Sequence, residues 1–142
     1  LKELGVDIVW CMPIYPIGTL GRKGTLGSYY AISDYCDVNP EFGTLADFDA
    51  FLKRAHELDM KVILDWVANH TARDARWIDE KPADWYERDA DGTPAVPWDW
   101  TDTAKLNYAN PAVWCGQIDA MRFWLCWCRS SSGSRRRASC GP

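Results

Sequence analysis

The sequence predicts an α/β fold with parallel strands, and three consecutive segments indicate it. Residues 6–12 form an apolar run typical of a buried strand, residues 45–58 have the spacing of an amphipathic helix, and residues 60–64 form a second apolar run. A strand, a helix and a strand of these lengths make a βαβ unit, which is right-handed and places both strands in one parallel sheet.

The first strand, VDIVWCM at residues 6–12, ends before Pro13 and Pro16. Its nearly continuous apolar run predicts burial on both faces, as in a parallel sheet. Residues 17–43 then carry five glycines and Pro40, a density of turn formers that excludes a sustained helix. A loop of this length is often functional.

The predicted helix at residues 45–58 has a start signal and one apolar face. Thr44 is suited to cap it, and Asp47 stands at the third helical position, which together make a capping box. Its apolar residues recur at spacings of three and four: Leu45, Phe48, Phe51, Leu52, Ala55 and Leu58. The second strand, MKVIL at residues 60–64, follows after a short turn.

The rest of the chain has less regular spacing. Residues 71–108 scatter tryptophans among Asp, Pro and Gly, which predicts an irregular excursion with at most a short helix near residues 73–78. Residues 111–125 return to helical spacing, with Pro111 at a favourable first-turn position. The composition changes at residue 126, where a tail rich in Ser, Arg and Cys begins.

Charge and hydropathy argue against two classes of partner. The formal net charge is −4, and residues 126–142 contain four arginines and no acid, so without these four positive charges residues 1–125 carry −8. Phosphate binding needs a positive surface, which argues against nucleic acid. No apolar stretch approaches the roughly 18 residues that cross a bilayer, so we expect no membrane span.

A polar cluster follows the second strand. Asp65, Asn69 and His70 supply a carboxylate, an amide and an imidazole within six residues. Because ligands gather beyond the carboxyl ends of parallel strands, the cluster has the character of a site. The alternative is that Asp65 caps the next turn and His70 only packs there, and spacing alone leaves both interpretations open.

The segment DWVANH at residues 65–70 resembles the D-x-x-x-N-H signature of the alpha-amylase family of glycoside hydrolases, at the end of the third barrel strand. Three other segments resemble family regions in the same order: GVDIVWCMPIYP (5–16), YAISDYCDVNPEFGTLADF (30–48) and TAKLNYANPAV (103–113). The resemblance implies a partial (β/α)8 TIM barrel over residues 1–125. It would comprise the second and third strands, an inserted irregular subdomain at about 71–108, and a helix toward the fourth strand.

The resemblance also assigns roles. Asp65 corresponds to the acid that orients the active-site arginine, and His70 to the imidazole that hydrogen-bonds sugar hydroxyls. Tyr30 corresponds to the tyrosine that stacks on the sugar, a contact that suits a flat ring with a polar tip. Trp98 and Trp100 are candidate outer sugar platforms. Ordinary packing is the alternative for Tyr30 and for both tryptophans.

Two further positions follow from the same comparison. Asn69 corresponds to a residue that contributes to a structural calcium site in some members, and an amide oxygen suits this hard cation. Asp59 stands where relatives commonly have Gly, so we expect a left-handed backbone there at some cost in stability. Apart from possible calcium, no cofactor is implied. Zinc bound by Cys126 and Cys128 is a weaker alternative, since no second ligand pair stands nearby.

The family chemistry is a retaining double displacement on alpha-glucans or related oligosaccharides, and it uses two carboxylates about 5 Å apart. In the family these lie on the fourth and fifth strands, and neither region is present in this sequence. We therefore expect a fragment that is inactive alone, with residues 126–142 as an out-of-frame or foreign tail. The alternatives are a non-catalytic carbohydrate-binding fragment and a transglycosylase or isomerase of the same family.

Overall fold

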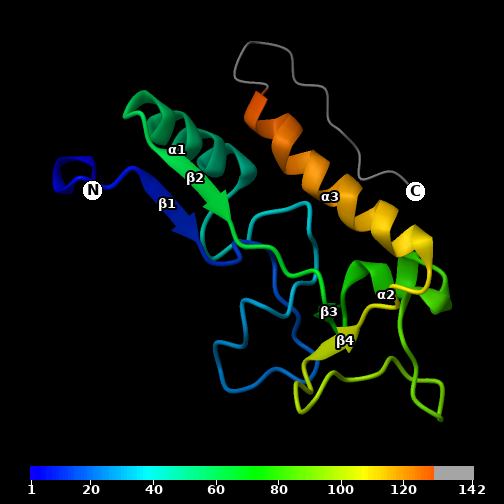
Figure 1. Cartoon of the computed structure of the whole chain (residues 1–142). Helices are drawn as coiled ribbons and strands as arrows, with labels where there is room; N and C mark the ends of the chain where they lie inside the picture. The colour runs from blue at the N-terminus through cyan, green and yellow to red at the C-terminus, as the bar shows by residue number, and fades with distance from the viewer. Residues whose placement is uncertain (130–142) are drawn as a thin grey trace.

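The computed structural model describes residues 1–129 of the chain. In order, its elements are η1 (Lys2–Leu4), β1 (Ile8–Cys11), α1 (Leu45–Glu57), β2 (Lys61–Leu64), β3 (His70–Ala72), α2 (Arg76–Glu80), η2 (Ala83–Trp85), β4 (Thr103–Lys105) and α3 (Pro111–Arg129). Figure 1 shows β1, α1 and β2 at one end and β3, β4 and α2 at the other, with α3 running alongside both.

The βαβ unit is present as predicted. β1 and β2 pair in parallel, in a register from Ile8 opposite Lys61 to Cys11 opposite Leu64. α1 connects them and lies on one face of the pair, and both strands point their carboxyl ends toward the loops below (Figure 1). These observations confirm the α/β class and the parallel strands.

Helix α1 begins and ends as its sequence predicts. The Thr44 side chain accepts a hydrogen bond from the Asp47 backbone, and the Asp47 side chain accepts one from the Thr44 backbone, which completes the capping box. The helix buries Phe48, Leu52 and Ala55. Asp59, two residues after the helix, has a φ of 51°, so the expected left-handed position is occupied by a residue with a Cβ atom.

The prediction that the first strand is buried on both faces is wrong for the described part of the chain, and β2 likewise has one exposed face. Ile8, Trp10 and Ile63 lie at the exposed positions of an alternating pattern and are 54%, 67% and 49% exposed. Val62 and Leu64, on the other face, pack against the core. The described strands form two separate two-stranded sheets, β1–β2 and β3–β4, and these do not close into a barrel.

The segment expected to be irregular contains a second small sheet. β3 and β4 pair antiparallel, with His70 opposite Lys105 and Ala72 opposite Thr103. Periodicity did not reveal these strands, since each has three residues and both are mostly buried. The short helix predicted at 73–78 is present as α2, shifted toward the carboxyl end.

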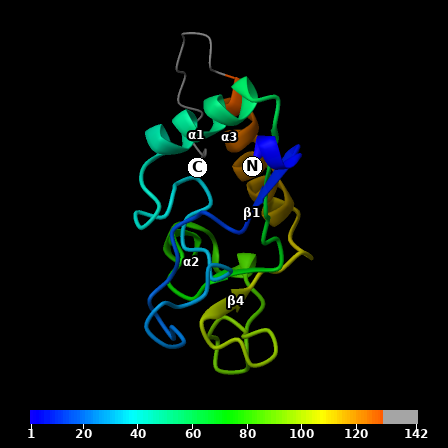
Figure 2. The ribbon, with the colours of Figure 1, turned by 90° about the vertical axis from the view of Figure 1, so that its left-hand side faces the viewer.

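Two buried clusters make up most of the core. The first joins the βαβ unit to α3 and contains Tyr15, Ile32, Tyr35, Val38, Phe48, Leu52, Val67, Ala120, Phe123 and Trp124. The second lies under β4 and contains Trp85, Tyr86, Ala104, Leu106 and Val113. Trp77 of α2 packs against both. In Figure 2 the labels of α1 and α3 lie at one end of the ribbon and that of β4 at the other.

Helix α3 extends beyond residue 125, where the sequence places the start of the tail, and reaches Arg129. Residues 130–142, the rest of that predicted tail, lie outside the described residues. Among residues 1–129, no helix has the length and hydropathy that a membrane span requires.

Candidate functional site

Asp65 is held at the end of β2 by backbone contacts. Its amide donates to the carbonyl oxygen of Cys11 at 3.0 Å, which extends the β1–β2 ladder by one residue. The hydroxyl of Tyr15, a fully buried residue, donates to the Asp65 carbonyl oxygen at 3.2 Å. The carboxylate is therefore presented from a fixed backbone, as expected at the carboxyl end of a parallel strand.

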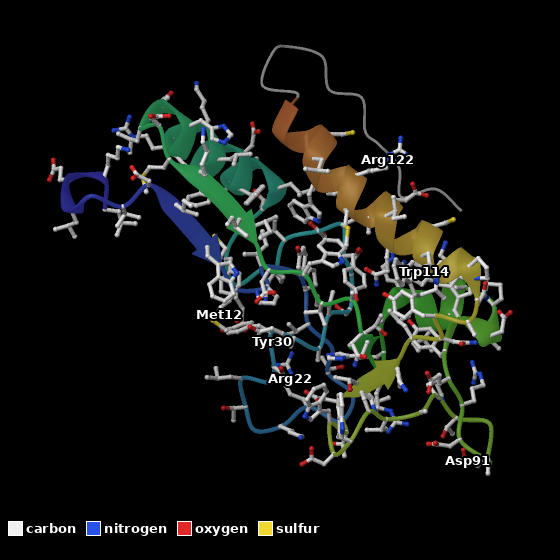
Figure 3. All side chains as sticks on the ribbon, in the orientation of Figure 1. Met12, Arg22, Tyr30, Asp91, Trp114 and Arg122 are labelled. Carbon is white, nitrogen blue, oxygen red and sulfur yellow. The ribbon has the colours of Figure 1, made fainter. Side chains whose placement is uncertain are left out.

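Tyr30 reaches this carboxylate from the glycine-rich loop. Its hydroxyl donates to Asp65 Oδ2 at 3.0 Å, and its side chain is 39% exposed. The hydrogen bond to Asp65 raises the pKa of the Tyr30 phenol, with smaller contributions in the same direction from burial and from the Asp65 charge. Figure 3 shows Tyr30 just below the ends of β1 and β2.

His70 lies in β3 and is 5% exposed. Its Nε2 is 3.1 Å from the carbonyl oxygen of Tyr30, and its Nδ1 is 3.1 Å from Nδ2 of Asn69. A carbonyl accepts only and an amide nitrogen donates only, so these partners fit a neutral imidazole protonated at Nε2. Burial lowers the pKa of His70, against opposing effects of the Tyr30 carbonyl and the Asp102 charge.

Two tryptophans extend from His70 toward solvent. The ring of Trp100 meets the imidazole edge to face at a centroid distance of 5.4 Å, and the rings of Trp98 and Trp100 are 4.6 Å apart. Trp98 is 76% exposed, and its backbone φ of 52° lies in the left-handed region. For a bulky residue this conformation is uncommon, and strained residues of this kind cluster at functional sites.

The structure thus connects most of the predicted site residues. Tyr30 contacts Asp65 through its hydroxyl and His70 through its carbonyl oxygen. Trp98 and Trp100 continue from His70 as a row of rings. Both ring nitrogens of His70 already have partners within the chain, so a hydrogen bond to a sugar hydroxyl would replace one of them.

Asn69 is the residue at which the family resemblance implies calcium. Calcium takes about six to eight oxygen ligands, which include amide and backbone carbonyl oxygens as well as carboxylates. Within residues 1–129, no group of three or more His, Cys, Asp or Glu side chains could hold a metal ion. The Asn69 amide is turned toward His70, and Lys105, opposite His70 in the sheet, pairs with Glu87 at 2.8 Å. Calcium binding by Asn69 stays a prediction, and the zinc alternative involves Cys128, whose side chain is outside the described residues.

Sequence reasoning missed two acidic residues near the site. Asp102 is 5% exposed and raises the pKa of His70 through its charge. Asp74 accepts hydrogen bonds from Thr19 and Leu20 of the glycine-rich loop. Asp74 stands four residues after His70, and Asp102 two residues after Trp100, but the sequence predicts no helix or strand that spans either interval. Both contacts depend on loops that are distant in sequence, so no local pattern signals them.

The family is established by comparison with known proteins. Residues 1–103 match a family model described as the alpha-amylase catalytic domain. The chain therefore belongs to the alpha-amylase family of glycoside hydrolases, as the D-x-x-x-N-H segment indicated.

Individual relatives agree with this assignment. The chain is 32% identical to maltase 1 of Drosophila virilis over 159 residues, which cover 87% of the chain and 24% of the maltase. It is 32% identical to trehalose synthase/amylase of Mycobacterium tuberculosis over 162 residues, covering 88% of the chain and 25% of that protein. Its structure resembles an alpha-amylase from Lactobacillus plantarum with a TM-score of 0.85 and 51% identity, covering 89% of this chain and 30% of that one. The chain thus spans about a quarter of the length of these two curated relatives.

Proposed function

We propose that the chain forms part of the sugar-binding face of a retaining glycosidase that acts on alpha-glucans or related oligosaccharides. The observation that carries this proposal is the contact of Tyr30 with both Asp65 and His70 beyond the end of β2. In this proposal, β1 and β2 are neighbouring strands of a partial (β/α)8 barrel, and their carboxyl ends face the substrate.

Each site residue has a role that its surroundings support. The hydroxyl of Tyr30 is tied to Asp65, which limits rotation of a partly exposed ring suited to stacking on a pyranose face. His70 is neutral near pH 7, because burial lowers its pKa, and it can donate or accept hydrogen bonds without a charge to desolvate. Trp98 and Trp100 add exposed rings on which further sugar units can stack.

Binding of maltotriose tests this proposal. Tryptophan fluorescence of the purified chain should change on titration, because Trp100 lies against His70. We expect Tyr30→Ala to weaken binding by about tenfold, the effect of losing roughly 1.4 kcal/mol of stacking and orientation. Tyr29→Ala is the matched control, since Tyr29 contacts Phe42 instead. Unchanged fluorescence of the unaltered chain at high maltotriose concentration would contradict the proposal.

We further propose that these 142 residues do not hydrolyse glycosides by themselves. A retaining glycosidase needs a nucleophile and an acid/base carboxylate about 5 Å apart, and the family regions that carry them have no counterpart in the sequence. Incubation with maltotriose and analysis of released sugars should show no turnover. Turnover that disappears in Asp65→Ala would refute this.

The relatives favour one alternative within the family. Trehalose synthase/amylase is as similar to this chain as the maltase is, and its name describes a reaction that makes a disaccharide. A transglycosylase or isomerase would use the same sugar-binding residues, so maltotriose binding does not distinguish it from a hydrolase. The product formed from maltose by the longer protein distinguishes them: glucose from a hydrolase, a rearranged disaccharide or longer sugar from the alternative.

A further inference from the structure

Hydrogen bonds to Asp74 join the glycine-rich loop to the segment that follows β3. Its Oδ2 atom accepts hydrogen bonds from the Thr19 amide at 2.8 Å, the Thr19 hydroxyl at 2.7 Å and the Leu20 amide at 3.0 Å. These partners lie more than fifty residues away in the sequence. Burial raises the pKa of Asp74, but the hydrogen bonds from Thr19 and Leu20 outweigh it, so the pKa falls below its ordinary value.

The contact is close because Gly18 has no side chain. A Cβ atom at Gly18 would lie 2.2 Å from Asp74 Oδ1 and 2.5 Å from the Ala72 Cβ atom. Real Cβ atoms essentially never approach other atoms to less than 3.0 Å. Glycine at this position therefore allows the loop to reach the Asp74 carboxylate.

Residues 17–20 of the glycine-rich loop lie beside the loop segment that carries Tyr30. The Gly18 amide donates to the carbonyl oxygen of Ala31 at 3.0 Å, and Ile17 and Ile32 form an antiparallel bridge. Tyr30 precedes Ala31, and its carbonyl oxygen is 3.1 Å from His70 Nε2. Asp74 thus holds residues 19–20 in place. These residues directly follow Ile17 and Gly18, whose contacts with Ala31 and Ile32 hold the backbone next to Tyr30.

We propose that Asp74 is a positioning residue for Tyr30: by fixing Thr19 and Leu20, its carboxylate holds the loop where the Tyr30 ring meets Asp65 and a bound sugar. This rests on the proposed sugar-binding function. Asp74 itself touches neither Tyr30 nor Asp65. Its effect should therefore reach the site only through the position of the Tyr30 side chain.

The first test needs no ligand, because the hydrogen bond to Asp65 raises the pKa of the Tyr30 phenol. The phenol is titrated by tyrosine absorbance, with Tyr30→Phe identifying its contribution. In Asp74→Ala its pKa should fall toward the ordinary value of about 10, and Asp74→Asn, which keeps one acceptor oxygen, should give an intermediate shift. An unchanged Tyr30 titration in Asp74→Ala overturns the proposal.

Asp91→Ala is the matched control. Asp91 also accepts hydrogen bonds from a threonine backbone and hydroxyl, those of Thr93, at 3.0 and 2.8 Å, and it lies far from Tyr30 in Figure 3. Its replacement removes hydrogen bonds of the same kind from a turn distant from the site and should not move the Tyr30 titration. If Asp91→Ala moves that titration equally, the effect is general loosening and the proposal fails. Should Asp74→Ala not fold, Asp74→Asn provides the same comparison.

The second test uses maltotriose. Asp74→Ala should weaken binding by no more than the about tenfold loss expected for Tyr30→Ala, because it acts through the position of Tyr30, and it should add no weakening in a chain that already carries Tyr30→Ala. Additive losses would show that Asp74 acts independently of Tyr30 and would overturn the proposal. Absence of maltotriose binding by the unaltered chain would overturn the proposed function instead, and the phenol titration would then decide alone whether Asp74 positions Tyr30.

Discussion

The βαβ unit and the segment from β3 to β4 differ in what holds them together. In the βαβ unit, α1 has its own cap and one apolar face, and this face packs on β2 and on α3. In the later segment, β3 and β4 are short and are joined by a turn-rich excursion from residue 73 to residue 102. The first region is built from local periodic signals, whereas the second depends on contacts between distant loops.

The largest predicted effect concerns the first core. Trp124 is 4% exposed, lies 5.2 Å from the Phe48 ring, and donates through Nε1 to the Tyr35 carbonyl oxygen at 2.7 Å. We expect Trp124→Ala to lower the free energy of unfolding by about 3–5 kcal/mol in urea denaturation. Trp114→Ala is the control, because Trp114 lies on the same helix and is 56% exposed. Equal losses would show that α3 does not pack on α1 as described.

A second prediction concerns a hydrogen bond that joins the two regions. The hydroxyl of Tyr35 is buried, which raises its pKa, and it lies 2.7 Å from the carbonyl oxygen of Val67 and 2.9 Å from that of His70. Tyr35→Phe leaves both carbonyl groups without this donor and should cost about 1–3 kcal/mol of unfolding free energy. Tyr29→Phe, on a half-buried ring of the loop, should cost less than about 0.5 kcal/mol. A small loss at Tyr35 would mean that water replaces the hydroxyl.

The cap of α1 offers a third prediction. The Thr44 side chain accepts a hydrogen bond from the Asp47 amide at 3.3 Å. Thr44→Ala removes it and should lower the unfolding free energy by about 1 kcal/mol. Thr25→Ala, in the exposed part of the glycine-rich loop, should have almost no effect in the same denaturation experiment. If both are neutral, the helix is held by its apolar face alone.

The same cap predicts a dependence on pH. Hydrogen bonds from the Thr44 hydroxyl and amide hold the pKa of Asp47 below its ordinary value of 3.8. A carboxylate with a lowered pKa in the folded chain stabilises it fully above the unfolded value, and this contribution is lost as the pH falls through the lowered folded value. The unfolding free energy of the unaltered chain relative to Asp47→Asn should therefore shrink as the pH drops below about 3.8. A constant difference would contradict the capping box.

The smallest effect is expected at Asp59. Its φ of 51° is unfavourable for a residue with a Cβ atom, so Asp59→Gly should raise the unfolding free energy by about 0.5 kcal/mol. Asp49→Gly is the opposite control, because Asp49 lies inside α1, where the lower helix propensity of glycine relative to Asp should cost about 0.3–0.5 kcal/mol. A loss at both positions would show that the left-handed turn does not strain Asp59.

Much of the fold was predictable because its signals are local. The cap at Thr44, the apolar spacing of α1 and the left-handed turn at Asp59 each depend on a few neighbouring residues. β3 and β4 were not predictable, since three buried residues have no measurable period. The sequence also did not predict that one face of β1 and β2 is exposed. An apolar run shows that its side chains are hydrophobic, but it does not show which of them other residues bury.

The site divides in the same way. Asp65, Asn69 and His70 stand within six residues, so the sequence alone indicated a polar cluster after a strand. The link to Tyr30, forty residues before His70, came from resemblance to a family. The contacts of Asp74 and the charge effect of Asp102 on His70 were visible only in the three-dimensional structure. Hydrogen bonds and charge effects between distant loops depend on how those loops pack.

Trp77 makes the two cores energetically dependent on each other. Its ring lies 4.9 Å from that of Tyr35 in the first core and 5.3 Å from that of Trp85 in the second. Because one aromatic side chain packs in both clusters, melting of either cluster removes packing from the other, which favours unfolding of the two in one step. Under the proposed function, a sugar bound beside β3 would stabilise the folded state as a whole. It would therefore also raise the temperature at which α1 unfolds, although it does not contact α1.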